Sequence, residues 1–182
     1  MLPCPPRRML SLLLLLALAL PVHGETLSIC YHYGCKQRGE AVLDALDNHQ
    51  LASLLAQPDP EHERQALAQA IGLMNQMAAR TTPIGHDRGG NVNDNGPGSQ
   101  DCIDHSTNTT TYLHYLLEHG WLHFHRVLEP VWRAPWLVDL HYSAAIEDLS
   151  DGLRYAVDSW FFDHGLPAVV LPLADWNKGW SP

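Results

Sequence analysis

The sequence predicts a single α+β domain in which helices, one of them starting at a cysteine, pack on an antiparallel β-sheet. Apolar residues recur at helical spacing through much of the region up to residue 119. Four segments rich in β-branched, aromatic or alternating residues follow, and turn residues separate them. Because helices precede a strand meander, the order favours an α+β arrangement.

The first 24 residues are typical of a secretory signal peptide. Arg7 and Arg8 form a positive n-region, and residues 10–20 form an apolar run of 11 residues. A run of this length is too short to span a membrane. We therefore expect cleavage near Gly24 and export to the periplasm or beyond. Residues 25–182, which number 158, would form one domain with a proper core.

The exported chain is expected to be acidic. Its formal net charge changes from −9 to −11 when residues 1–24, with two arginines and no acidic residue, are removed. A chain of this charge offers no electrostatic attraction for nucleic acid or anionic lipid. We expect neither as a partner, and no membrane association of the mature form.

Two helices are predicted before the first long loop. Residues 37–56 carry apolar side chains at helical spacing and end before Pro58. A second helix begins at Asp59, which can cap it, with Pro60 at the first helical position. The apolar stripe of this second helix consists of Leu67, Ala70, Ile71, Met74, Met77 and Ala78.

Residues 81–100 are rich in glycine and asparagine and predict a long loop. Loops of about twenty residues inside a compact domain are usually functional or disordered. This loop leads directly into Cys102, which favours a function. It lacks the lysine and the preceding strand of a phosphate-binding loop, so we expect no nucleotide site. A third helix follows over residues 101–119 and ends at Gly120.

Strands are predicted at residues 122–132, 138–147, 153–160 and 168–171. The second and third of these would pair across a turn near Gly152. If the turn holds an even number of residues, opposed positions have an odd sum. Because 141 and 158 also have an odd sum, His141 and Asp158 would then share a face of the sheet. A turn of odd length without a bulge would place them on opposite faces.

Three cysteines remain once the signal peptide is removed. Cys30 and Cys35 favour a short local disulfide, as expected in an oxidising compartment. A zinc site is the alternative, with His32 as the one further ligand nearby. Cys102 is then unpaired, and it is either a reactive thiol or a buried structural one.

Cys102, His141 and Asp158 have the residue types and order that cysteine-based acyl transfer requires. The positive end of a helix dipole favours the thiolate, and unpaired N–H groups there can receive an oxyanion. His141 would act as the base, and Asp158 would fix its tautomer. The second oxyanion donor would come from Gln100 or from an asparagine of the preceding loop.

A group of histidines offers a competing site. His119, His123 and His125 lie close in sequence, with His114 about one helical turn upstream. His123 and His125 would share a strand face and could bind a transition metal. Apart from Glu118, no acid or cysteine at ligand spacing completes the set. A histidine-rich surface strand is therefore the favoured interpretation.

The chain resembles the transglutaminase-like, papain-fold cysteine enzymes over roughly residues 61–172. The resemblance rests on Cys102-Ile103-Asp104-His105 at a helix start, Leu-Leu-Glu-His-Gly at the helix end, His141 on a strand, and Asp158 in Tyr-Ala-Val-Asp. It implies a papain-like core with Cys102 as nucleophile, His141 as base and Asp158 as its orienter.

Exported bacterial members of that superfamily include peptidases that trim surface proteins. Some of them bind calcium through acids that flank the cysteine. Asp101 and Asp104 flank Cys102 here, whereas Ile103 stands where a second flanking acid is usual, and Gln100 replaces a frequent glycine.

These observations predict an exported cysteine-dependent hydrolase or acyltransferase that acts on peptide or amide bonds of a protein or peptide substrate. No cofactor is expected at the site. The first alternative is a non-catalytic periplasmic binding module with the same fold, and the second is an exported metal-binding protein. The sequence does not identify the substrate or the oligomeric state, and it does not distinguish hydrolysis from acyl transfer.

Overall fold

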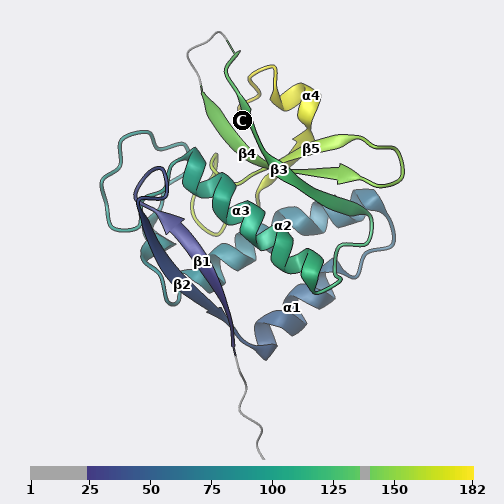
Figure 1. Cartoon of the computed structure of the whole chain (residues 1–182), viewed down its shortest axis with the longest axis horizontal. Coiled ribbons are helices and arrows are strands. Elements are labelled where there is room, and N and C mark those ends of the chain that lie inside the picture. The colour runs from purple at the N-terminus through teal and green to yellow at the C-terminus, as the bar shows by residue number, and fades with distance from the viewer. Residues whose placement is uncertain (1–23, 136–139) are drawn as a thin grey trace, which may run out of the picture.

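The computed structural model describes residues 24–135 and 140–182 and confirms an α+β fold (Figure 1). Apart from Gly24, the predicted signal peptide lies outside the described residues. The strands are β1 (Glu25–Tyr31), β2 (Gln37–Leu43), β3 (His125–Arg133), β4 (His141–Asp148), β5 (Arg154–Asp158) and β6 (Val169–Pro172). The helices are α1 (Ala45–Leu55), α2 (Pro60–Ala78), the short 3-10 helix η1 (Pro83–His86), α3 (Cys102–Glu118) and α4 (Leu173–Trp176).

The described strands form two antiparallel sheets. β1 pairs with β2, and β3, β4, β5 and β6 form a four-stranded sheet in sequence order, which confirms the predicted meander. Figure 1 shows α3 running between the two sheets. It packs against β3 and β4 on one side and against β1 on the other. The helix that carries Cys102 is therefore the central element of the fold.

One hydrophobic core connects both sheets with the helices. Ile29 of β1, Leu67 of α2, Leu113 of α3 and Ile146 of β4 are fully buried in the same cluster. Burial of an aliphatic side chain of this size stabilises the fold by about 1.5–3 kcal/mol. The core thus fixes α3 relative to both sheets.

α2 and α3 begin at the capping residues that the sequence indicates. The Asp59 carboxylate accepts the His62 N–H at 2.9 Å. The Asp101 carboxylate accepts the Asp104 N–H at 2.9 Å, and the Asp104 carboxylate accepts the Asp101 N–H at 3.2 Å. This reciprocal capping box fixes Cys102 as the first residue of α3.

The prediction of one helix over residues 37–56 is wrong in its first part. That part is β2, and α1 begins only after Asp44, whose carboxylate caps it. Side chains of β2 alternate, with Ala41 and Leu43 buried and Val42 exposed. An apolar run this short is compatible with both the helical and the strand repeat. Pairing with β1, which was not predicted, makes this segment a strand.

The four later strands lie close to their predicted positions. The predicted start of the second of them, at residue 138, lies outside the described residues. α4, which follows β6 directly, was not predicted. It packs against β5 and β6 and contributes the fully buried Trp176.

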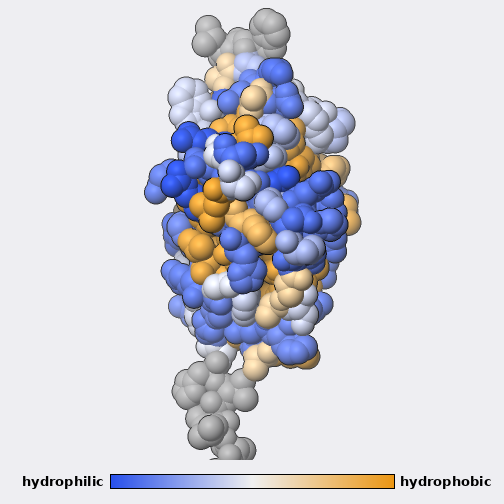
Figure 2. Space-filling view, turned by 90° about the vertical axis from the view of Figure 1, so that its right-hand side faces the viewer, coloured by the Kyte–Doolittle hydropathy of each residue, from blue (hydrophilic) through white to orange (hydrophobic). Residues whose placement is uncertain are grey.

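The surface mixes polar and apolar side chains. Figure 2 shows hydrophobic residues interspersed among hydrophilic ones on one face of the molecule. Exposed leucines also flank the turn between β4 and β5, where Leu149 is 60% and Leu153 is 56% exposed. Scattered apolar residues of this kind are normal on a protein surface.

Candidate active site

The β4–β5 register places His141 and Asp158 on one face of the sheet. Ala144 pairs with Val157 and Ala145 with Ala156, so opposed residue numbers have an odd sum. The parity prediction is confirmed, because the His141 Nε2 and Asp158 Oδ2 atoms lie 2.7 Å apart. Both side chains are buried.

The Asp158 carboxylate is held by three donors. Its Oδ2 atom accepts from His141 Nε2 and also from the indole N–H of Trp176, at 2.9 Å. Its Oδ1 atom accepts the backbone N–H of Trp160 at 3.1 Å. With both oxygens occupied, Asp158 has little freedom to rotate, and it orients the His141 ring.

Aromatic side chains surround the His141 ring. The ring centroids of Trp160, Phe161 and Trp176 lie 4.9, 5.3 and 5.7 Å from that of His141. Burial alone would lower the pKa of His141. The hydrogen bonds and charges of Asp158 and Cys102 outweigh burial and raise that pKa to about 9. The imidazole is therefore protonated at neutral pH.

Cys102 faces His141 across a small cavity. Its thiol is free and partly exposed at the first residue of α3. The cavity has a volume of about 250 Å³, and Cys102, His141, Leu140 and Trp160 contribute to its wall. Because Nε2 of His141 is bonded to Asp158, Nδ1 is the ring nitrogen that remains for the thiol. The structure thus brings the three predicted site residues together.

One oxyanion donor follows from the start of α3. Helix geometry leaves the first N–H groups without intrahelical acceptors. The Asp101 carboxylate takes the N–H groups of Ile103 and Asp104, at 3.0 and 2.9 Å. The N–H of Cys102 itself therefore stays available for an oxygen bound beside the thiol.

Gln100 does not supply the second donor. Its side-chain amide donates to the carbonyl of Cys30 at 2.9 Å, and the residue is buried. Among the loop asparagines, Asn91 lines the Cys102 cavity, but its amide donates to Asp87 at 3.1 Å. Asn93 and Asn95 line a neighbouring cavity.

The predicted disulfide between Cys30 and Cys35 is present and closes a strained turn. His32, Tyr33 and Cys35 all have positive φ values, of 68°, 61° and 56°. Such backbone costs of order 1–3 kcal/mol for each residue and persists only where neighbours enforce it. The disulfide is one such constraint.

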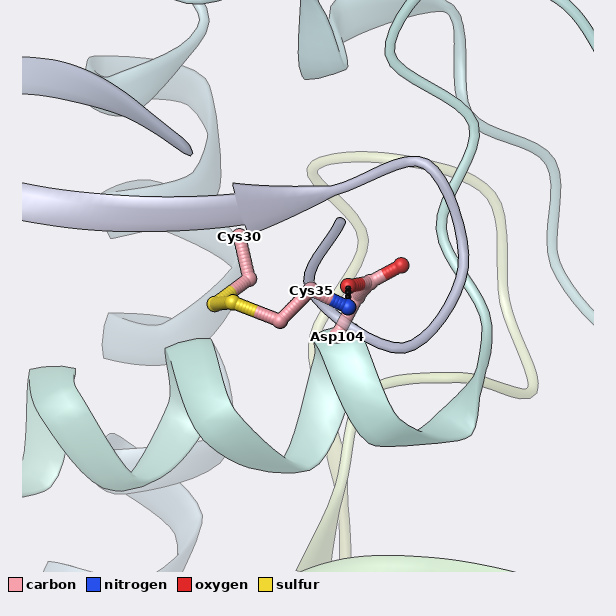
Figure 3. A group of neighbouring side chains, drawn as sticks. All are labelled: Cys30, Cys35 and Asp104. Atoms are coloured by element: carbon pink, nitrogen blue, oxygen red, sulfur yellow. Dashed lines mark hydrogen bonds between the residues drawn. A yellow bond between two sulfur atoms is a disulfide. The ribbon is translucent and has the colours of Figure 1, made fainter. Parts of the chain in front are cut away.

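Asp104 is the second constraint on this turn. Its carboxylate accepts the N–H of Tyr33 at 2.7 Å and that of Cys35 at 2.6 Å, and Figure 3 shows the latter contact beside the disulfide. The side chain is buried, and burial, the largest influence, together with the nearby charge of Asp101 raises its pKa above the ordinary value. Tyr33, held in this way, forms part of the wall of the Cys102 cavity.

Neither metal alternative near this turn has free ligands. Cys30, Cys35 and Asp104 have ligand atoms within 4.8 Å of one another, but the two sulfurs are bonded to each other. The Asp104 carboxylate instead receives backbone N–H groups, as does that of Asp101. The arrangement is that of a capped helix start rather than of a calcium or zinc site.

A second network of buried hydrogen bonds lies next to the His141–Asp158 pair. His105 Nε2 lies 2.9 Å from Asp87 Oδ2, and His105 Nδ1 lies 2.8 Å from the hydroxyl of Ser159. Ser159 directly follows Asp158, and it also contacts the hydroxyl of Thr109 at 3.0 Å. All of these side chains are buried, so the network connects the loop, α3 and the end of β5 without reaching a substrate.

The predicted histidine-rich surface strand is wrong for His125. This ring is 1% exposed, and its Nδ1 lies 2.8 Å from a carboxylate oxygen of Glu63, which is also buried. Glu63 further accepts the N–H groups of His123 and Phe124, at 2.7 and 3.0 Å. His125 therefore joins α2 to the start of β3, because an ionised residue of α2 lies opposite it.

Sequence reasoning missed Trp176, Asp87 and Tyr33 as parts of the site. Trp176 lies in a segment without a motif, so nothing in the sequence connects it with Asp158. Asp87 lies inside the glycine- and asparagine-rich loop whose function was anticipated. The four-residue spacing between Cys30 and Cys35 was the one signal for the turn that carries Tyr33.

Comparison with protein-family models, with curated proteins and with solved structures found no match to this chain. Within residues 24–135 and 140–182, no helix combines the length and the hydrophobicity needed to cross a bilayer.

Proposed function

We propose that this protein is an exported cysteine-dependent hydrolase or acyltransferase that acts on peptide or amide bonds. The observation that carries the proposal is a protonated imidazole, that of His141, which Asp158 fixes and which lines one cavity together with Cys102. This is the arrangement that activates a cysteine nucleophile. The disulfide between Cys30 and Cys35 is typical of an oxidising compartment and supports export.

The proposed reaction begins with attack of the Cys102 thiolate, whose proton His141 holds, on a substrate carbonyl carbon. A C–S bond forms, and the carbonyl electron pair moves to oxygen, where the N–H of Cys102 stabilises it. When the intermediate collapses, the C–N bond breaks and the leaving amine takes the proton of His141. Water or a second amine then attacks the thioester, His141 accepts its proton, and the C–S bond breaks to return the Cys102 thiolate beside the protonated His141.

A papain-like core is part of the proposal. The nucleophile at the start of a central helix precedes a histidine and an aspartate on consecutive antiparallel strands, as in the superfamily that the sequence resembles. Fold-level likeness alone does not establish an activity. The chemistry of the site is therefore the main support.

Peptide-library cleavage by the protein comprising residues 25–182 tests the proposal. We expect cleavage, or transfer to an added amine, that disappears in Cys102→Ala and falls by at least a hundredfold in His141→Ala. Intact-mass measurement should detect an acyl group on Cys102 with an activated ester. If all three proteins leave the library intact and no acyl-enzyme forms, the non-catalytic binding module becomes the better interpretation.

A further inference from the structure

A second cavity adjoins the one that contains Cys102. It has a volume of about 480 Å³. Tyr33 and Val92 line both cavities, so a single layer of side chains separates them. The remaining residues of its wall are His32, Lys36, Gln37, Asn93 and Asn95. The two cavities therefore lie on either side of Tyr33 and Val92.

The second cavity carries positive charge on an acidic protein. Its lining contains one ammonium group, one imidazole and three carboxamides, while the whole chain has a formal net charge of −9. Across the described part of the chain, Lys36 is the one lysine or arginine whose side chain has no hydrogen bond or ion pair. An ammonium group left unpaired beside hydrogen-bond donors favours an anionic ligand.

Hydrogen bonds hold the wall between the two cavities in place. The Tyr33 hydroxyl donates to Asn91 at 2.9 Å and accepts the N–H of Asp94 at 2.8 Å. The carboxylate of Asp94 accepts the N–H of Gly96 and is not part of the cavity wall. The β1–β2 turn and the loop before α3 are thus joined by hydrogen bonds, and Figure 1 shows them side by side near the start of α3.

The strained β1–β2 turn fixes the backbone position of Lys36. The N–H of His32 donates to the carbonyl of Ser99 at 2.8 Å, in addition to the bonds from Asp104 and the disulfide. Backbone strain enforced by so many contacts is a feature of ligand-binding segments. Lys36 follows Cys35 directly, so its backbone position beside the second cavity is fixed.

From these observations we infer that the second cavity binds a carboxylate of the substrate, close to the amide that Cys102 attacks. This inference rests on the proposed function, because it assigns a subsite to the same reaction. The carboxylate is either that of an Asp or Glu side chain or that of a peptide C-terminus. Lys36 supplies the charge, and Gln37, Asn93 and Asn95 supply neutral donors.

Paired fluorogenic peptides test this subsite. One peptide carries Glu and its partner carries Gln, at each position around the scissile amide, and each is made with a free or an amidated C-terminus. We expect kcat/KM to be about fivefold higher for one carboxylate form, as for a charge-assisted bond at a partly solvated site. Preference for Glu identifies a side chain, and preference for the free C-terminus identifies the chain end.

Two lysine variants supply the matched comparison. Lys36→Met should abolish the preference, whereas Lys36→Arg should retain most of it. Lys178→Met is the control, since Lys178 pairs with Asp175 and lies outside both cavities. Equal kcat/KM for both peptide forms, or equal loss for both in Lys36→Met, would overturn the inference.

Binding to the Cys102→Ala protein separates this inference from the proposed function. Fluorescence anisotropy with the same labelled peptides requires no turnover. Tighter binding of the carboxylate form, lost in the Lys36→Met/Cys102→Ala double variant, would support the subsite even if the protein had no activity. Cleavage without any effect of the carboxylate would leave the proposed function standing and contradict the subsite.

Discussion

At the residue scale, the protonation state of His141 decides what Cys102 can do. Three donors fix the Asp158 carboxylate, and that carboxylate together with Cys102 outweighs the effect of burial on the pKa of His141. An imidazolium next to a thiol can stabilise the thiolate and later protonate a leaving amine. The same ring then serves both halves of the proposed reaction.

The first prediction concerns pH. Because the folded-state pKa of His141 is raised from 6.5 to about 9, its charged form stabilises the fold fully below the unfolded pKa. That stabilisation, and with it acid catalysis, should be lost as the pH rises through about 9. NMR titration of the ring measures this pKa directly.

Two variants control the titration. Asp158→Asn removes the negative charge beside His141, and Cys102→Ser replaces the thiol by a hydroxyl that does not ionise in this pH range, so the ring should titrate at lower pH in both. A wild-type ring that titrates near 6.5, or a titration that neither variant changes, would contradict the geometry of the triad.

At the element scale, α3 brings together the thiol, its cap and the turn that forms the cavity wall. Asp101 caps the helix, and Asp104, two residues beyond Cys102, accepts N–H groups of the β1–β2 turn. The disulfide constrains that turn, whereas His141 and Asp158 lie on β4 and β5. A variant that disorders the β1–β2 turn should therefore leave the reactivity of the Cys102 thiol largely unchanged.

The second prediction tests this independence. The Cys30→Ser/Cys35→Ser double variant should lose about 2 kcal/mol of stability, because the closed loop is short. Urea denaturation measures this loss. The alkylation rate of Cys102 should change little, while kcat/KM should fall because Tyr33 and Lys36 lose their fixed position. Alkylation that slowed to the rate of a free cysteine would show that the turn is required for activation.

The elements with clear local signals were the predictable ones. Asp59 and Asp101 mark helix starts, and the odd sum of positions 141 and 158 anticipated a shared face. β1 and β2 could not be distinguished from other segments because their pairing is a tertiary property. The bond from Trp176 to Asp158 likewise depends on how the chain returns to β5 after β6.

At the scale of the whole molecule, a buried ionic network joins α2 to the four-stranded sheet. Glu63 and His125 are in contact at 2.8 Å, and Arg64 pairs with Asp148 at 2.9 Å while its guanidinium lies over the Tyr155 ring. Burial opposes ionisation of Glu63. Hydrogen bonds from His125, His123 and Phe124 outweigh that effect and lower its pKa.

The third prediction concerns Glu63→Gln. A lowered carboxylate pKa stabilises the fold above the unfolded pKa, and this contribution is lost as the pH falls toward the folded pKa. The variant should lose about 3 kcal/mol at neutral pH, as when one partner of a buried pair is removed. Its stability should also decline less in acid, as measured by urea denaturation across a pH series. If the stability of Glu63→Gln fell as steeply in acid as that of the wild type, protonation of Glu63 would not be the cause of the acid destabilisation.

The alkylation rate of Cys102 by iodoacetamide at neutral pH tests the central claim most directly. In the protein comprising residues 25–182, Cys102 should alkylate far faster than a free cysteine, and this advantage should be lost in His141→Ala. Intact-mass analysis with Cys102→Ser as the control confirms the site of labelling. Rates that are slow and equal in the wild type and in His141→Ala would contradict an activated thiol and, with it, the proposed enzyme.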